Sequence, residues 1–333
     1  DEPGCYDDAY IKWVAQHDPE QVENCRCSTP PAWTGKPVDK APRGVHEPYV
    51  FAGPENLTHT AFVAEETCEF VRHHADRPFF CIAGIYAPHA PINPPPRFLG
   101  MYDADDMPLP QRAEGENFAD VADGDWQRIK AYYYALISHI DDQVGRILAD
   151  LERNEILDDT IIVFTSDHGE NLGDHGRVAK GNPHDSSSRV PLVVSYPAAF
   201  DGGVRQNEII EAVDIVPTLL DWCGVQIPPF MQGRSFRPLL ETGRGDYEVR
   251  DAAMMEIRCP LGTAYKALRT ADHLYVMHKN GCEELYDLAR DPHQLQDVAG
   301  EATATEDLQT MRHRLLQRWF EVEGQYPRRT GQY

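Results

Sequence analysis

The residues with the clearest chemical potential lie in the stretch IIVFTSDHGENLGDHGRVAKG, which spans Ile161 to Gly181. Asp167 and His168 directly follow its apolar run, and a hard carboxylate beside an imidazole can bind a divalent metal ion. Lys180 adds a positive point charge suited to an oxyanion, and the glycines allow close approach of the backbone to a ligand. On residue types alone, an Asx turn at Asp167 and a surface lysine explain the pattern equally well.

A second candidate lies in the segment APHAPINPPPRF, which holds five prolines in twelve residues. So many prolines prevent a strand from continuing and produce a stiff, extended loop. Loops of this kind commonly carry functional side chains. His89 stands in this loop between Pro88 and Pro91, where it can donate a proton to a bound group or simply cap a nearby carbonyl.

Apolar spacing predicts the elements that position these residues. Helical periodicity is present from Thr60 to His74 and, most clearly, from Gln127 to Glu152. Buried strands are predicted by the apolar runs RPFFCIAGIY, TIIVFTS and RVPLVVSYP, and a short helix by DIVPTLLDWCG. The alternation predicts a layered α/β domain whose ligands lie outside the carboxyl ends of its strands.

The pattern changes after about residue 245. The short segments AAMMEI, YKALRT, HLYVMH and EELYDL are separated by polar turns, and a last amphipathic helix carries Leu308, Met311, Leu315, Leu316 and Trp319. These features predict a small antiparallel sheet with a helix packed on it. We therefore expect residues 1–245 to belong to the main α/β domain and residues 246–333 to form a small α+β subdomain.

Composition narrows the partners of the protein. The formal net charge of −23 disfavours nucleic acid, because lysine and arginine supply most of the affinity for phosphate backbones. The longest apolar run is far below the roughly 18 residues that a membrane span needs. The eight cysteines define no disulfide framework, and the sequon Asn56-Leu57-Thr58 hints at a secreted, periplasmic or lysosomal protein. The oligomeric state has no signal in the sequence.

Five segments, in order, resemble the formylglycine-dependent sulfatases, a family of the alkaline phosphatase superfamily. They are RPFFCIAGIYAPHAP, YYYALISHIDDQVGRILADLE, FTSDHGENLGDHGRVAKG with SRVPLVVSYP, DIVPTLLDWCGV and EELYDLARDPHQLQDVA. The resemblance runs from about residue 60 to residue 300. It implies the α/β/α sandwich of that superfamily, followed by a small C-terminal antiparallel sheet and helix.

The same resemblance implies roles for four residues. Asp167 and His168 are expected to be metal ligands, for calcium, and His89 and Lys180 are expected to bind the sulfate group and act in catalysis. A metal ion and cationic side chains stabilise the negative charge that develops as a sulfate ester reacts. The implied substrate is a sulfated small molecule or glycan.

The nucleophile of the family is missing from this sequence. Members convert the Cys of Cys-x-Pro/Ala-x-Arg to formylglycine, and neither Cys27 nor Cys259, nor any other cysteine, stands in that pattern. The paired aspartates that complete the family's metal site are also absent. The chain therefore resembles the C-terminal portion of a sulfatase, with formylglycine expected in a missing N-terminal part. Such a fragment is expected to be inactive alone and to expose apolar edges of a parallel sheet.

The predicted function is hydrolysis of a sulfuric ester, and the expected substrate is a sulfated carbohydrate. Sulfuryl and phosphoryl groups require similar electrostatic clamps, so a phosphonate monoester hydrolase or phosphodiesterase of the same superfamily is one alternative. A protein that binds anionic glycans without turning them over is the other alternative, because it would explain the missing nucleophile.

Overall fold

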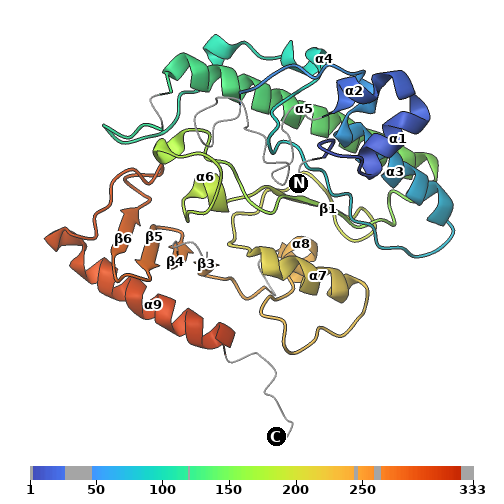
Figure 1. Cartoon of the computed structure of the whole chain (residues 1–333). Helices are drawn as coiled ribbons and strands as arrows, with labels where there is room; N and C mark the ends of the chain where they lie inside the picture. Colours follow the sequence, from blue (N-terminus) through green and yellow to red (C-terminus); the bar gives the residue numbers. More distant parts are fainter. Residues whose placement is uncertain (1–2, 27–46, 119–120, 244–246, 259–263, 324–333) are drawn as a thin grey trace, which may run out of the picture. The chain divides into compact units, whose positions relative to one another are not determined.

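The computed structural model describes residues 3–26, 47–118, 121–243, 247–258 and 264–323. The chain divides into two compact units, whose elements are labelled in Figure 1. The first unit contains Asp1–Thr160 and Asn171–Ala179, and the second contains Ile161–Glu170 and Lys180–Tyr333. The boundary predicted near residue 245 falls inside the second unit and stays a prediction about that unit's internal organisation.

Helices dominate the first unit. The two long helices are α3 at His59–His74 and α5 at Asp123–Arg153, and they pack side by side (Figure 1). Thr58 caps α3 by accepting a hydrogen bond from the amide of Ala61. Both helices confirm the periodicity argument. The shorter helices are α1 Ala9–His17, η1 Pro19–Gln21, α2 Val22–Cys25, η3 Glu55–Leu57, α4 Pro96–Leu99, η4 Ala104–Asp106 and η5 Asp174–Gly176.

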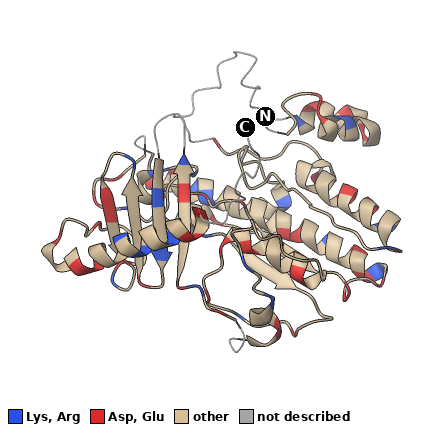
Figure 2. Ribbon diagram, turned by 90° about the horizontal axis from the view of Figure 1, so that it is seen from below, with Lys and Arg blue, Asp and Glu red and all other residues tan. Residues whose placement is uncertain are grey.

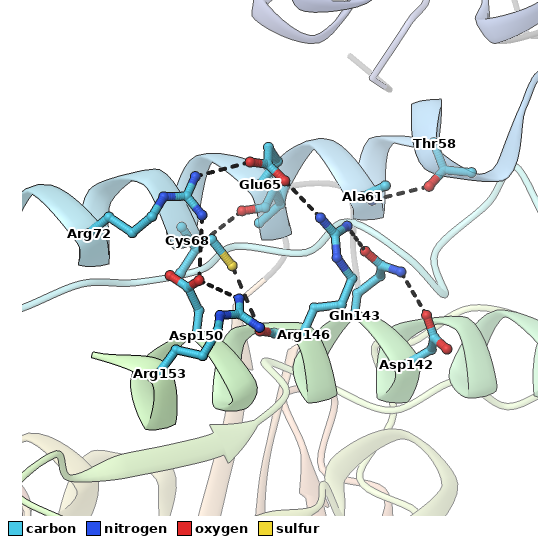
Figure 3. Close-up of polar contacts among 12 residues, drawn as sticks. Thr58, Ala61, Glu65, Cys68, Arg72, Asp142, Gln143, Arg146, Asp150 and Arg153 are labelled. Atoms are coloured by element: carbon cyan, nitrogen blue, oxygen red, sulfur yellow. Dashed lines mark hydrogen bonds and ion pairs between the residues drawn. The ribbon is translucent and has the colours of Figure 1, made fainter. Parts of the chain in front are cut away.

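Charged side chains bridge α3 and α5, as Figure 3 shows. Glu65 of α3 pairs with Arg146 of α5 at 2.7 Å and with Arg72 of its own helix at 3.1 Å. Asp150 of α5 is buried and pairs with Arg153 at 2.5 Å and with Arg72 at 3.5 Å. Arg72 therefore links the two acids into one network that fixes how the helices lie against each other.

The segment RPFFCIAGIY, residues 77–86, is not the buried strand that its apolar run predicts. It forms no regular secondary structure, and Phe80 and Ile82 are 73% and 78% exposed. A buried strand needs neighbouring strands that satisfy its N–H and C=O groups and layers that cover its faces. None of the described strands pairs with this segment. The prediction was wrong because an apolar composition does not by itself provide a neighbouring strand for the segment to pair with.

The second unit begins with a two-stranded sheet. Strands β1, Ile162–Thr165, and β2, Leu192–Ser195, are antiparallel. Both strands were predicted, but their expected parallel arrangement and burial were wrong, because Phe164 and Val193 are 39% and 59% exposed. A sheet of two strands cannot cover its own faces. Around it lie α6 Asp185–Ser188, η6 Ala212–Asp214, α7 Ile215–Trp222 and α8 Arg237–Glu241, of which α7 is the helix predicted from DIVPTLLDWCG.

The predicted C-terminal sheet and helix are confirmed. The antiparallel sheet has the order β3-β4-β5-β6, and its strands are β3 Ala252–Arg258, β4 Ala264–Thr270, β5 His273–His278 and β6 Glu283–Asp287. After η8, Ala302–Ala304, helix α9, Thr305–Glu323, runs beside the sheet (Figure 1). One sheet face and α9 share a core that includes Leu268, Tyr275, Leu285, Met311 and Leu315. The other face has its own cluster of Tyr265, Ala267, Leu274, Val276 and Tyr286.

A buried ion network ties the C-terminal sheet and α9 to the segment before α7. Arg250, which is buried and precedes β3, pairs with Asp214 and with Glu211, each at 2.6 Å. Arg318 of α9 also pairs with Glu211, at 2.8 Å. Along the same sheet and helix, acidic and basic residues are interspersed (Figure 2), and ion pairs such as Arg314–Asp251 lie at the surface. The buried network differs from these surface charges, because removing one of its members would leave its partner charged and buried, with neither a counter-ion nor water around it.

The cysteines show no disulfide among the described residues. Free thiols are found at Cys25, Cys68, Cys81, Cys223 and Cys282. Cys27 and Cys259, two of the cysteines that lack the nucleophile pattern, lie outside the described residues. In the described part of the chain, no helix combines the length and the apolar character needed to cross a bilayer.

Candidate functional site

Asp167 and His168 lie just beyond the carboxyl end of β1, where the sequence placed them. The Ser166 hydroxyl donates to the His168 carbonyl at 2.8 Å, and the His168 amide donates to Asp167 Oδ1 at 3.0 Å. These local bonds form the turn. The carboxylate remains 84% exposed and its Oδ2 lies 3.5 Å from Nε2 of His168. The structure thus brings the two predicted metal ligands together.

The hydrogen bond at the far side of the ring decides which nitrogen of His168 can bind a ligand. Nδ1 lies 2.8 Å from the carbonyl oxygen of Gly169, and because a carbonyl only accepts, Nδ1 carries the proton. In the neutral ring, Nε2 then presents a lone pair toward Asp167 Oδ2. Two electron-pair donors so close are stabilised by a shared cation, or by a proton on Nε2. The pair therefore fits one side of a metal site.

The described residues alone do not complete such a site. They contain no group of three or more His, Cys, Asp or Glu side chains that could hold a metal ion. Calcium usually takes 6 to 8 oxygen ligands. Asp167 and His168 can therefore contribute only part of the coordination sphere, and the other ligands must come from water, substrate or further residues.

The turn of Asp167 and His168 packs against helix α6. The amide of Gly169 donates to the Ser187 carbonyl at 2.8 Å. A Cβ atom at position 169 would lie 2.1 Å from the carbonyl oxygen of Ser186, which is far inside contact distance. Only glycine allows the two backbones to approach so closely. The turn that carries Asp167 and His168 is consequently in direct contact with α6.

Lys180 stands where the chain re-enters the second unit. The segment before it, Asn171–Ala179, belongs to the first unit. Its two ends are joined by Asn171, whose amide and side chain both donate to the Ala179 carbonyl, at 3.1 and 2.6 Å. Lys180 is exposed, and among the described residues its ammonium has no ion-pair partner. Gly181 follows with a φ of +98°, and a Cβ there would lie 3.6 Å from Ile257 of β3. The backbone is fixed while the charged group stays free to bind an anion.

His89 lies in the first unit and is described within it. Its Nδ1 lies 2.9 Å from the Ala90 carbonyl, so Nδ1 donates and Nε2 is left with a lone pair. The carbonyl-capping role considered for this histidine is therefore real, but it occupies only one nitrogen. The ring of Tyr86 packs 4.7 Å from the imidazole, centroid to centroid. Nε2 remains available to accept or, once protonated, to donate.

A small cavity of about 60 Å³ beside His89 was not predicted from the sequence. It is also lined by His59 and His139. Burial lowers the pKa of each of these two histidines to about 4, although Asp8 near His59 and Asp142 near His139 act in the opposite direction. Both rings are therefore neutral at ordinary pH. A histidine at a helix start and another on an apolar helix face gave no signal that they share one cavity.

An open cleft of about 2460 Å³ lies in the second unit. Its lining includes Asp167, Asp185 at the start of α6, and Ile257 and Tyr265 of the C-terminal sheet. The candidate metal-binding carboxylate and the C-terminal sheet thus border the same space. The cleft is large enough for a sugar-sized anion to reach Asp167.

Comparisons with known proteins agree on one family. The family model described as Sulfatase matches residues 10–225, and the model described as N-sulphoglucosamine sulphohydrolase, C-terminal, matches residues 173–320. An arylsulfatase of Clostridium perfringens is 29% identical over 339 residues, which cover 95% of this chain and 66% of the relative. An N-acetylglucosamine-6-O-sulfatase of Bacteroides thetaiotaomicron is 35% identical over 184 residues, which cover 53% of this chain and 33% of the relative.

The fold has a close counterpart among solved structures. A phosphonate monoester hydrolase of Agrobacterium radiobacter superposes with a TM-score of 0.82 at 27% identity, covering 94% of this chain and 69% of that one. The α/β fold predicted from the resemblance is thereby confirmed. The chain thus spans about two thirds of the length of the arylsulfatase.

Proposed function

From the premise that this chain belongs to the sulfatase family, we propose that the protein containing it hydrolyses sulfate esters of carbohydrates. The observation that carries the proposal is the arrangement of Asp167, His168 and Lys180 in the matched segment, with the metal-binding pair held together and the ammonium free. The likeness to an N-acetylglucosamine-6-O-sulfatase supports a sugar as the alcohol portion of the substrate.

The proposed cofactor is Ca²⁺, held in part by Asp167 and His168. A bound divalent cation would neutralise charge on the sulfate oxygens and orient the group. The exposed carboxylate of Asp167 and the Nε2 of His168, whose Nδ1 donates to the Gly169 carbonyl, suit a cation, and two such groups require further ligands. The fit is thus partial and specific: this chain supplies one side of the coordination sphere.

Lys180 and His89 are proposed to act on the sulfate ester itself. The ammonium of Lys180 would bind a sulfate oxygen and stabilise the charge that grows on it during bond breaking. His89 can donate a proton to the leaving oxygen only from Nε2, because Nδ1 is committed to the Ala90 carbonyl. Proton donation to the leaving oxygen matters most for poor leaving groups such as sugars.

The nucleophile is proposed to be the formylglycine of the family. Among the described cysteines, Cys81 has Ala83 two places on but Ile85 four places on, and Cys68 has the required Arg72 but Phe70 at the second place. Neither meets both conditions of Cys-x-Pro/Ala-x-Arg. The residues of this chain are therefore assigned to binding, charge stabilisation and proton donation.

A phosphonate monoester hydrolase remains the second candidate, because the solved structure with a TM-score of 0.82 has that activity in its name. Both reactions use a metal and cations around a tetrahedral anion, so the site geometry alone favours neither. The sulfatase relatives in the comparisons favour the sulfate ester.

The test is to assay the complete gene product on an aryl sulfate and on the matched aryl phosphonate monoester, with and without a calcium chelator. We expect higher kcat/KM on the sulfate and loss of activity on chelation. A higher kcat/KM on the phosphonate would reverse the ranking. Tight binding of a sulfated oligosaccharide with no turnover of either ester would instead indicate an anionic-glycan-binding protein.

A further inference from the structure

We propose that Gln294 and Arg269, in the C-terminal sheet and the turn after it, are positioning residues for the sulfate site. They hold α6, and through α6 they fix the turn that carries Asp167 and His168 and the segment that follows Lys180. The inference rests on the proposed function for its catalytic consequence. The contacts that carry it all lie within the second unit.

Gln294 makes the first of these contacts. It is 2% exposed, has a φ of +58°, and its Oε1 accepts a hydrogen bond from the Asp185 amide at 2.9 Å. Asp291 stabilises the turn around it, because its Oδ2 accepts from the amides of Leu295 and Gln296 at 2.6 and 2.8 Å. Because the turn around Gln294 is already fixed, its Oε1 is in position to accept from Asp185, the first residue of α6.

Arg269 makes the second contact with the same residue. From β4, its Nε and Nη2 lie 3.4 Å from Oδ1 and Oδ2 of Asp185, so the guanidinium faces both carboxylate oxygens. Planar pairing of this kind fixes orientation as well as distance. Together, Gln294 holds the backbone of Asp185 and Arg269 holds its side chain.

Helix α6 transmits this position to the proposed metal ligands. Its Ser187 carbonyl accepts the Gly169 amide at 2.8 Å, and its Ser186 carbonyl occupies the space that a Cβ at position 169 would need. A shift of α6 must therefore move Gly169 and, one and two residues earlier, His168 and Asp167. The contact has no slack to absorb such a shift.

The segment after Lys180 depends on the same sheet. His184, which is 5% exposed, packs edge-on against Tyr286 of β6 with ring centroids 5.4 Å apart. Asn182 Oδ1 accepts from the His184 amide at 3.1 Å, and Gly181 lies against Ile257 of β3. The sheet that contributes no group to the proposed chemistry thus sets the backbone on both sides of the site.

Two substitutions of Gln294 separate the effect of its hydrogen bond to Asp185 from the effects of side-chain volume and overall stability. Gln294→Leu keeps the approximate volume but removes the acceptor for the Asp185 amide. Gln294→Glu keeps an acceptor oxygen and breaks no hydrogen bond from Nε2, which has no partner in the described structure. It is assayed at a pH at which the buried carboxyl is protonated, because an unpaired buried charge would be costly. Gln296→Leu is the matched control, since Gln296 is exposed and its side chain bonds only to Glu301, at 3.2 Å.

The experiment measures steady-state kinetics of these three variants in the complete gene product, with hydrogen exchange on each. We expect Gln294→Leu to lower kcat for the aryl sulfate about 10-fold with KM changed less than about 2-fold. The reason is that a shift of α6 would move the proposed site groups, including Lys180, away from the positions that stabilise the transition state. Gln294→Glu should restore most of kcat, and Gln296→Leu should match the wild type. Exchange should quicken at residues 181–189 in Gln294→Leu while the centres of β4 and β5 stay protected.

Wild-type kcat and KM in Gln294→Leu would overturn the proposal, and so would a loss of kcat that Gln294→Glu shares. Exchange at residues 181–189 that equals the wild type would overturn it as well. If the wild-type protein cleaves no sulfate ester, the proposed function fails. The exchange comparison still decides whether Gln294 holds α6, so the two failures are distinguishable.

Discussion

The two sheets of the second unit differ in how well they are covered. The sheet of β1 and β2 leaves Phe164 and Val193 substantially exposed, whereas Leu268 and Tyr275 of the C-terminal sheet are fully buried. Yet Asp167 and His168 follow β1, the poorly covered strand. The proposed metal-binding turn and the best-packed core therefore lie in different parts of this unit, and α6 is the element that contacts both.

The buried ion network between the C-terminal sheet and the segment before α7 is the place where a substitution should cost most. Arg250→Ala leaves Asp214 buried without its cation, and breaking a buried pair from one side costs roughly 3–5 kcal/mol of unfolding free energy. Arg314→Ala is the matched control, since its partner Asp251 is 85% exposed and such pairs contribute about 0–1 kcal/mol. Urea unfolding of both variants measures the difference, and equal losses would show that the buried network stabilises the unit no more than a surface ion pair does.

The contrast between the sheets themselves is sharpened by truncating one apolar side chain in each. Leu268→Ala should lower the unfolding free energy by about 2–5 kcal/mol, because it opens a cavity in the core shared with α9. Val193→Ala, at a position that is 59% exposed, should change it by less than about 0.5 kcal/mol. Urea or thermal unfolding measures both. A larger loss from Val193→Ala would mean that β2 is covered in solution and that the comparison is wrong.

A pH titration extends the comparison to the buried histidines of the first unit. Burial lowers the pKa values of His59 and His139 to about 4 from the ordinary value of 6.5, so the unfolded chain takes up the protons first as the pH falls. Stability from this source is complete above pH 6.5 and is lost between about pH 6.5 and 4. The loss is at most ~1.4 kcal/mol per pH unit for each histidine.

Replacing His139 by Leu tests this directly, because the ring no longer titrates. Unfolding free energies measured from pH 7 to pH 4.5 should fall less steeply in the variant than in the wild type. Arg97, close enough to lower the pKa of His139, is unchanged in both proteins. Identical slopes would show that His139 is already charged, or solvated, in the folded protein.

The sequence predicted those elements whose signals lie within a short stretch of the chain. The helices α3 and α5 were found because each has a periodic apolar face, and the strands β3 to β6 because turns of polar residues place neighbouring strands next to one another in the chain. The turn of Asp167 and His168 was equally local. In each case the information lies within a few residues of the feature.

What could not be predicted depends on contacts between distant residues. The apolar segment around Phe80 and Ile82 was expected to be buried, but no pattern within it says whether a neighbouring strand is there. The contact of Gln294 with Asp185 spans 109 residues, and glutamine in a polar turn gives no signal of it. If the proposal holds, the position of the proposed sulfate site depends on a segment whose sequence gave no functional signal.

The most direct test of the account is the turnover of Lys180→Ala in the complete gene product, measured on an aryl sulfate alongside calcium content. Because Lys180 has no lone pair when protonated, calcium should stay bound while kcat falls roughly 10²-fold, the effect of removing one preorganised donor. Asp167→Ala should lose calcium, and Lys12→Ala, at an exposed site in α1, should behave as the wild type. Wild-type kcat in Lys180→Ala would show that the lysine is a surface residue and would contradict the proposed site.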